Sequence, residues 1–208
     1  MVDLLTTNHT SFNREYAHFL DLTTRVLPEI RSMRQSPRRL RIWSAACSSG
    51  EEPYSIAIAL LESIAMERQA WDALILATDI AGSVITRARS GRFNTETVAG
   101  LEPDLRRRYF VDEPDGNLRI SRHCRDLVRF AVLNLQGIWP MRGPFDVIFC
   151  RNVLIYFDAD TKRRLVQRLH DLLAPGGTLY VGHTESLGTM PHEFDALKPS
   201  VYTRRNMA

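Results

Sequence analysis

Three groups of residues in this 208-residue chain combine small and polar side chains in ways that could hold a ligand. The first is residues 44–52, with the sequence SAACSSGEE. The second is Asp79, at the end of an apolar run. The third is the string CRNVLIYF, which places Arg151, Asn152 and Tyr156 behind another apolar run. We expect each group to lie in a loop that follows a buried strand.

The chemistry of these groups favours a nucleoside that carries a positive charge. Small residues in loop 44–52 let a ligand approach the backbone closely, although an ordinary tight turn explains the loop equally well. Glu51 and Glu52 would repel a pyrophosphate and attract a cation. Asp79 could accept both hydroxyls of a ribose or, equally, cap the helix that follows. S-adenosylmethionine is the common cofactor that meets both conditions.

Two strands joined by a helix would bring the first two groups together. Residues 39–46 alternate as a strand, residues 51–66 have helical spacing, and residues 71–78 form a continuously apolar strand. This βαβ unit implies a parallel sheet with a right-handed crossover. Further helices are expected at residues 14–33 and 82–89. Ligands of such sheets bind outside the carboxyl ends of the strands.

The second half of the chain predicts an excursion from the sheet and then four more strands. A short helix near residues 104–109 precedes the turn PDGN, which lies between the runs YFV and LRI and indicates a hairpin. Leu165 and Leu169 belong to an amphipathic helix that is expected to stop at Pro175-Gly176-Gly177. The four strands are expected at residues 128–133, 147–150, 178–182 and, paired with the third of these, 200–203.

Composition and charge are those of an ordinary globular chain, with 44% apolar and 25% charged residues. The 27 basic and 24 acidic residues leave a net charge of +3, which is too small to indicate binding to nucleic acid or to a membrane surface. The longest apolar run has six residues, whereas a membrane-spanning helix needs about 20. Without a secretory signal or paired cysteine spacing, we expect a cytoplasmic protein with free thiols.

Strings along almost the whole chain resemble the bacterial chemotaxis receptor methyltransferases of the CheR type. Between about residues 5 and 204, the chain contains in that family's order TNHTSFNRE, SAACSSGEEPYSIA, ATDI, VLNL, GPFDVIFCRNVLIYF, LAPGGTLYVGHTES and VYTRR. The resemblance implies an α/β, class I S-adenosylmethionine-dependent methyltransferase fold: a Rossmann-like, mostly parallel sheet with an antiparallel last strand. It also implies two parts of the chain: an amino-terminal helix and linker at 1–38, and a methyltransferase domain at 39–208. A small antiparallel β subdomain is expected to be inserted in that domain at about 93–127.

The resemblance further implies an activity, a cofactor and partners. S-adenosylmethionine would methylate glutamate side chains on the cytoplasmic methylation helices of chemoreceptors and leave S-adenosylhomocysteine. We expect a monomer that binds no nucleic acid and does not insert into a membrane. No metal is implied, and His123-Cys124 lacks further ligands at zinc spacing.

Site residues follow from the resemblance position by position. Arg14 and Tyr156 match the two residues that the family places beside the transferred methyl group, and they are the expected catalytic residues. The family's cofactor contacts match Asn8, Thr10, Arg14, Glu52, Asp79, Asn134, Leu135, Arg151 and Asn152.

The implied chemistry needs no general base, because a glutamate carboxylate is already ionised at neutral pH. Catalysis then consists of alignment in a relatively dry site, where an anionic oxygen and a cationic sulfonium neutralise each other. Arg14 could hold the substrate carboxylate or the cofactor's own carboxylate. Tyr156 could orient the attacking oxygen or the methyl group.

Two departures from the family leave other functions open. The family's FFR reads Phe12-Asn13-Arg14 here, and typical members carry a helical domain before the region that matches. A module that binds S-adenosylmethionine or its product without turnover is therefore the alternative function. A methyltransferase for small acids or RNA is a less favoured third.

Some surface features allow two interpretations. Five arginines within residues 31–41 could dock acidic receptor helices, or they could form a solvated face: Arg31, Arg34, Arg38, Arg39 and Arg41. The predicted hairpin corresponds to a subdomain that in some members grips a peptide at the receptor tail by strand addition. Its turn is shorter here, so we expect no binding of a tail peptide.

Other reactive residues near the predicted loops receive no catalytic role. Cys47, before a helix start, could have a lowered pKa. His183, Thr184 and Glu185 follow a strand end, where we expect them to line the cleft.

Overall fold

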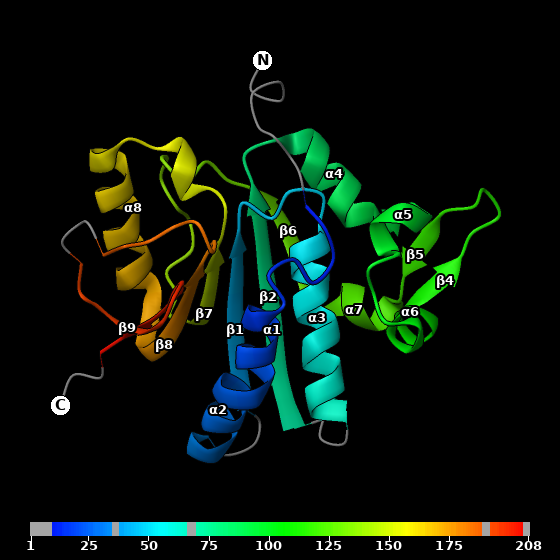
Figure 1. Cartoon of the computed structure of the whole chain (residues 1–208), viewed down its shortest axis with the longest axis horizontal. Coiled ribbons are helices and arrows are strands. Elements are labelled where there is room, and N and C mark those ends of the chain that lie inside the picture. Colours follow the sequence, from blue (N-terminus) through cyan, green and yellow to red (C-terminus); the bar gives the residue numbers. More distant parts are fainter. Residues whose placement is uncertain (1–9, 35–37, 66–69, 189–191, 206–208) are drawn as a thin grey trace.

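A seven-stranded sheet forms the centre of the computed structural model, which describes residues 10–34, 38–65, 70–188 and 192–205 (Figure 1). Its strand order is β6-β2-β1-β7-β8-β10-β9. The parallel strands are β6 (Val128–Val132), β2 (Trp71–Asp79), β1 (Arg38–Ala45), β7 (Phe145–Cys150) and β8 (Leu173–Val181). β10 (Val201–Arg204) pairs antiparallel with β8 and with β9 (Phe194–Lys198). The predicted mostly parallel sheet with an antiparallel end is confirmed.

The central strands carry neighbouring apolar residues on opposite faces because both faces of the sheet are covered. In β1, Ile42 belongs to one hydrophobic cluster and Trp43 to the other, and in β7 Val147 and Ile148 divide in the same way. Successive side chains of a strand point to opposite faces, so a strand between two helical layers needs apolar residues at every position.

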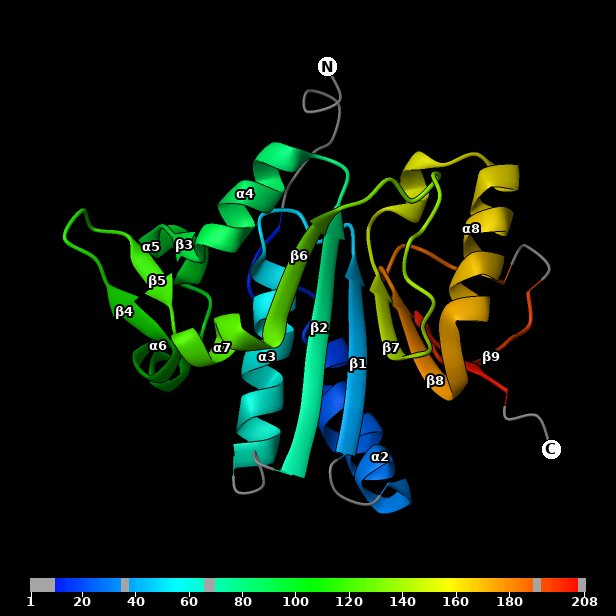
Figure 2. The same cartoon turned by 180° about the vertical axis from the view of Figure 1, so that it is seen from behind.

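Helices on the first face include the amino-terminal segment and α3 (Glu51–Ile64). Figure 2, from behind, shows the strands in front of them. The amino-terminal helix comprises α1 (Ala17–Asp21), a π-helical turn at Leu22–Val26 and α2 (Leu27–Met33). It begins three residues later than predicted, because Asn13 and Glu15 adopt left-handed backbone angles.

The other helices complete the layers. α4 (Gly82–Ser90) and α7 (Arg122–Leu127) pack with the first cluster, and α8 (Ala159–Leu172) covers the second face. α8 ends before the predicted Pro175-Gly176-Gly177, because the chain enters β8 directly at Leu173. Among the described residues, no helix is both long enough and apolar enough to cross a membrane.

A small antiparallel sheet lies beside the main one, with the order β3-β5-β4 (Figure 1). Its strands are β3 (Arg92–Phe93), β4 (Phe110–Asp112) and β5 (Leu118–Ile120), and it carries α5 (Thr95–Val98) and α6 (Pro103–Tyr109). The predicted hairpin is therefore present as β4 and β5. β3 and the edge strand β9 were not predicted, because β3 has only two residues and most of β9 is exposed without apolar alternation.

Candidate active site

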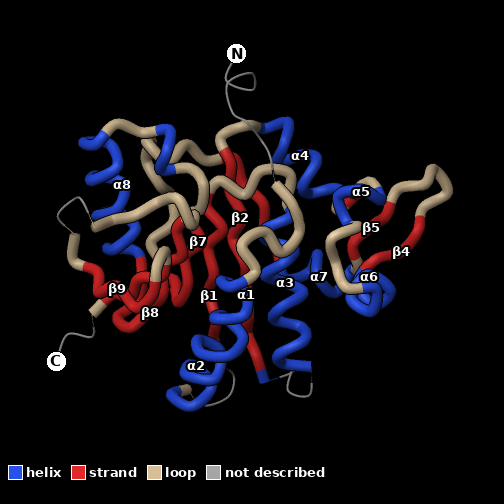
Figure 3. Tube along the Cα trace, in the orientation of Figure 1, coloured by secondary structure: helices blue, strands red, loops and turns tan. Residues whose placement is uncertain are grey.

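Loops follow the carboxyl ends of the parallel strands at one edge of the sheet (Figure 3). A cavity of about 310 Å³ is lined there by residues that follow β1, β2, β6 and β7. Every predicted site residue in the described part of the chain lines it: Thr10, Arg14, Glu52, Asp79, Asn134, Leu135, Arg151, Asn152 and Tyr156. Asn8 lies outside the described residues. The parallel topology brings the positions after the strands together, because all four loops leave the same edge of the sheet. Thr10 and Arg14 come from the amino-terminal segment, which contacts this edge through the hydrogen bond from Arg151 to the Arg14 carbonyl.

Backbone N–H groups orient Asp79 toward the cavity. Oδ2 accepts a hydrogen bond from the N–H of Ser48 at 2.9 Å, and Oδ1 accepts one from the N–H of Ala81 at 3.1 Å. No side chain caps the amino end of α4. The helix-cap alternative for Asp79 is therefore wrong, and this carboxylate instead ties the β1 loop to the β2 loop.

The two adjacent carboxylates at the start of α3 point to different places. Glu52 lines the cavity, where it accepts hydrogen bonds from Ser44 Oγ at 2.7 Å and from Arg151 Nη1 at 3.0 Å. Glu51 is buried against the hydroxyl of Ser49, and burial raises its pKa. The expectation that both charges face a ligand is wrong for Glu51, because consecutive helix positions do not share a face.

Arg151 holds the amino-terminal segment against the sheet edge. Its buried guanidinium donates to Glu15 Oε2 at 3.0 and 3.2 Å, to Glu52, and to the backbone carbonyl of Arg14. Burial alone would raise the pKa of Glu15, but the charge of Arg151 and hydrogen bonds from Asn152 and the His183 backbone lower it. Burial raises the pKa of Glu52, against the lowering effect of the Arg151 charge and the Ser44 hydrogen bond. With both carboxyl groups ionised, the Glu15–Arg151–Glu52 group carries one net negative charge next to the cavity.

Asn13, which replaces the second phenylalanine of the family's FFR, fits the local backbone of residues 12–14. Phe12 is buried in the small β subdomain, with its ring 4.9 Å from that of Phe93. Asn13 has a φ of 54°, and its backbone N–H donates to Ser55 Oγ at 2.9 Å. Asparagine tolerates this left-handed conformation better than most residues. The segment thus places the side chain of Arg14 at the cavity.

The carboxylate of Glu185 holds the loop after β7 in place through hydrogen bonds to the backbone. Its carboxylate accepts from the backbone N–H groups of Asn152 at 2.8 Å, Gly182 at 2.6 Å and Ile155 at 3.2 Å. Asn152 has a φ of 56°, and a Cβ at Gly182 would come within 2.5 Å of the Asn152 amide nitrogen. This close packing shapes the 3₁₀ turn Leu154–Tyr156, which presents the half-exposed Tyr156 to the cavity.

Two expectations about neighbouring residues are corrected. His183, Thr184 and Glu185 are not among the residues that line the cavity. Glu185 instead accepts hydrogen bonds from the backbone of the loop after β7. The only feature of the sequence that pointed to Glu185 was its position after a strand. Cys47 does line the cavity, but it is 1% exposed, and burial together with the charges of Asp79 and Glu52 raises its pKa. It is therefore not an activated thiol.

The five arginines at positions 31, 34, 38, 39 and 41 belong to the end of α2, the residue after it and the first half of β1, away from the carboxyl end of β1 where the cavity lies (Figure 1). Arg34 forms an ion pair with Asp146 at 2.5 Å, and Arg41 forms one with Asp72 at 2.6 Å. Acidic partners within the chain thus engage part of this charge. Docking of acidic receptor helices on the remaining charge stays a prediction.

Comparisons with known proteins agree with this geometry. Residues 8–203 match the family described as CheR methyltransferase, SAM binding domain. A probable chemotaxis protein methyltransferase of Rhizobium etli is 42% identical over 206 residues, which are 97% of this chain and 76% of that protein. Chemotaxis protein methyltransferase 1 of Pseudomonas aeruginosa is 40% identical over 203 residues, which are 96% of this chain and 74% of that protein.

A solved structure of the methyltransferase domain of bacterial CtHen1-C aligns with a TM-score of 0.44 at 14% identity, over 79% of this chain and 64% of that one. The family match and the two relatives carry the assignment. The chain belongs to the CheR methyltransferases, with a class I fold and S-adenosylmethionine as its cofactor, and it serves methylation in chemotaxis.

Proposed function

We propose that this protein methylates glutamate side chains on the cytoplasmic helices of chemoreceptors, giving glutamyl methyl esters and S-adenosylhomocysteine. The observation that carries the proposal is the convergence of Asp79, Arg14 and Tyr156 on one cavity. Asp79 suits the nucleoside end of the cofactor, and Arg14 and Tyr156 suit a carboxylate substrate.

Asp79 retains the capacity to bind a ribose. Each carboxylate oxygen has about two lone-pair sites, and one site on each is used by Ser48 or Ala81. The remaining site on each oxygen suits one hydroxyl of a ribose diol. Small residues in the preceding loop, among them Ala46 and Ser48, line the same cavity and leave room beside the backbone.

Charge around the cavity suits a cationic cofactor. Asp79 contributes one negative charge and the Glu15–Arg151–Glu52 group contributes another, against the single positive charge of Arg14. When bound, S-adenosylmethionine supplies a methyl group activated by a positive sulfur. An acidic wall stabilises that sulfur more than it stabilises the neutral product, and the guanidinium of Arg14, which lines the cavity, is of the type that binds a carboxylate.

Arg14 and Tyr156 would act by orientation. The glutamate carboxylate attacks the methyl carbon as an anion, the bond between that carbon and sulfur breaks, and its electron pair stays on sulfur. No proton moves, so neither residue needs to act as a base. A guanidinium and a phenol at the mouth of the cavity can fix the direction of attack, which is the main requirement for such a displacement.

A labelling experiment tests the proposal. The protein is incubated with methyl-labelled S-adenosylmethionine and receptor-containing membranes, and base-labile methyl esters are counted. We expect esters with the wild type and with Asp126→Asn, an exposed carboxylate on α7, and a strong loss with Tyr156→Phe. Cofactor binding without any ester would contradict the proposal and favour the alternative of a non-catalytic sensor.

A further inference from the structure

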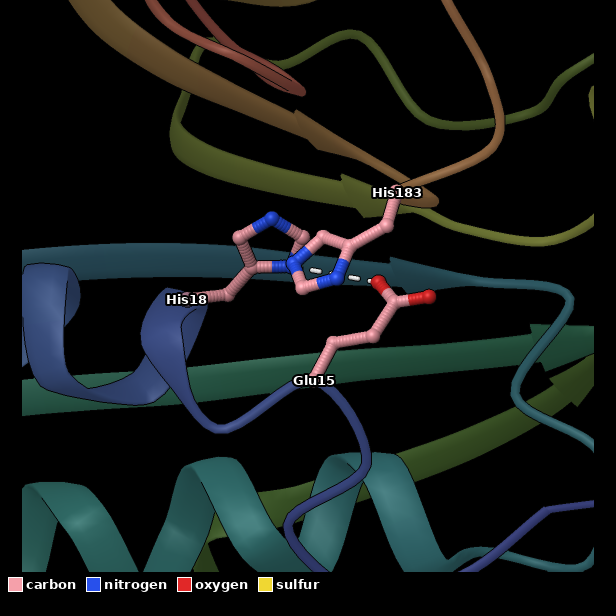
Figure 4. A group of neighbouring side chains, drawn as sticks. All are labelled: Glu15, His18 and His183. Carbon is pink, nitrogen blue, oxygen red and sulfur yellow. Dashed lines mark ion pairs between the residues drawn. The ribbon is translucent and has the colours of Figure 1, made fainter.

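Three side chains next to the cavity, but outside its lining, form a cluster of metal-binding type. Glu15 precedes α1, His18 lies in α1, and His183 follows β8, so the cluster joins the amino-terminal segment to the sheet edge (Figure 4). Each offers one ligand atom, and these atoms lie within 4.8 Å of one another. The His18 and His183 rings are 4.9 Å apart and nearly perpendicular.

The contacts of Ser200 suggest a tautomer for His18. Nε2 lies 2.8 Å from the Ser200 hydroxyl oxygen, and that hydroxyl lies within hydrogen-bond distance, 2.6 Å, of the Pro199 carbonyl to which it can donate. On this basis we assign the ring proton to Nε2 and a lone pair to Nδ1. His18 is 1% exposed, and Nδ1 has no hydrogen-bond partner among the described residues.

That lone pair is directed at another electron-rich atom. Nδ1 lies 3.6 Å from Glu15 Oε2, and a ring nitrogen of His183 lies within 4.8 Å of the ligand atoms of both residues (Figure 4). A buried acceptor without a donor is costly, and a cation between these atoms would satisfy it. Two imidazoles and one carboxylate are a donor set that zinc prefers.

We propose that Glu15, His18 and His183 form a binding site for a divalent transition metal of the zinc class. Tetrahedral zinc with bonds of about 2.0–2.2 Å needs ligand atoms roughly 3.3–3.6 Å apart. His18 and Glu15 already meet this spacing. The ligand atoms of all three residues lie within 4.8 Å of one another, so the exposed His183 would have to move closer when the metal binds. Ser200, which holds the opposite ring nitrogen of His18, is the outer partner that metal-bound histidines usually have.

This site goes beyond methyl transfer and would oppose it. Glu15 Oε2 also accepts two hydrogen bonds from Arg151, so a metal ion on that oxygen competes with the guanidinium. Arg151 in turn holds Glu52 and the Arg14 carbonyl at the cavity. Metal binding should therefore loosen the cavity wall and weaken the binding of S-adenosylhomocysteine.

Calorimetric titration of the full chain with Zn²⁺ tests the site without any assay of activity. We expect one tight equivalent for the wild type, and at least a roughly tenfold weaker affinity for His183→Ala. His123→Ala, an exposed histidine on α7, is the matched control and should bind like the wild type. No binding by the wild type, or equal binding by His183→Ala, overturns the proposal.

Two further measurements identify the ligands and the consequence. Co²⁺ should give the visible spectrum of a four-coordinate site without a charge-transfer band from thiolate, whereas such a band would assign the metal to a cysteine and overturn the proposal. Zn²⁺ should weaken S-adenosylhomocysteine binding to the wild type but not to His183→Ala. An equal effect on both would overturn the link to the cavity. A failure of the proposed glutamate methylation would leave the zinc titration unaffected, so the two failures are distinguishable.

Discussion

Arg151 and Glu15 are 136 residues apart in the sequence and are joined by two hydrogen bonds of 3.0 and 3.2 Å at the edge of the sheet. The contact connects the loop after β7 to the segment that carries Arg14. Because Arg151 also binds Glu52, three separate parts of the chain meet at one buried guanidinium. Arg151 therefore positions the wall of the cavity through these contacts, in addition to the residues that would touch the cofactor.

Replacement of Arg151 by methionine should destabilise the fold by about 3 kcal/mol, because it leaves the partly buried Glu15 and Glu52 without their cation. Urea unfolding measures the loss. Arg106→Met removes an arginine whose ion pair with the exposed Asp112 spans 3.9 Å, and it should cost less than about 1 kcal/mol. Equal losses in the two variants would contradict the role of Arg151 as the buried connection.

Glu185→Gln should slow methyl transfer and lower stability by about 1–3 kcal/mol. The amide offers one acceptor where three backbone N–H groups now meet a carboxylate, so the turn that presents Tyr156 loses part of its support. Turnover and urea unfolding are measured beside Glu193→Gln, which changes an exposed carboxylate. A variant with wild-type turnover and stability would show that Glu185 does not position the loop.

Asn13 provides a test of backbone conformation. Its φ of 54° is left-handed, so Asn13→Ala should lower the free energy of unfolding by about 1 kcal/mol, whereas Asn13→Gly should cost less than Asn13→Ala. Thermal unfolding of the two variants gives the comparison. If alanine proves as stable as glycine, the left-handed turn before Arg14 is not the conformation in solution.

Acid should remove the stability that Asp21 contributes. Burial alone would raise the pKa of Asp21, but hydrogen bonds from Arg25, Lys198 and Tyr180 lower it to about 2. The folded state therefore binds fewer protons than the unfolded state between about pH 2 and 4. The contribution, about 2 kcal/mol, is complete above that window and is lost as the pH falls through it.

Asp21→Asn should accordingly be less stable than the wild type at neutral pH, and the difference should shrink as the pH approaches 2. Asp195→Asn, which changes an exposed ion pair with Arg205, is the matched control and should differ little from the wild type at any pH. A gap between Asp21→Asn and the wild type that does not depend on pH would contradict the lowered pKa.

The sequence predicts those parts of the site that depend on local pattern. Asp79 and Arg151 each follow a buried strand, so parallel topology alone places them at one edge. The directions of Glu51 and Glu52 were not predictable in this way, because they depend on how α3 is rotated against the sheet. The resemblance to CheR proteins supplied Thr10 and Arg14, for which strand and helix patterns give no signal.

Long-range contacts explain what the sequence could not predict. The pairing of Glu15 with Arg151, and of His18 with Ser200, depends on the packing of α1 against β7 and β8. Neither pair has a characteristic spacing in the sequence. The raised pKa of Cys47 likewise results from burial near Asp79 and Glu52, which a position before a helix start does not reveal.

Calorimetric titration with S-adenosylhomocysteine tests most directly whether the cavity that Asp79 faces is the cofactor site. The wild type and Asp126→Asn should bind with equal affinity, and Asp79→Asn should bind at least roughly tenfold more weakly, because an amide cannot accept both hydroxyls of a ribose. Circular dichroism checks that the variants are folded. Wild-type affinity in a folded Asp79→Asn variant, or no binding by the wild type, would contradict the account.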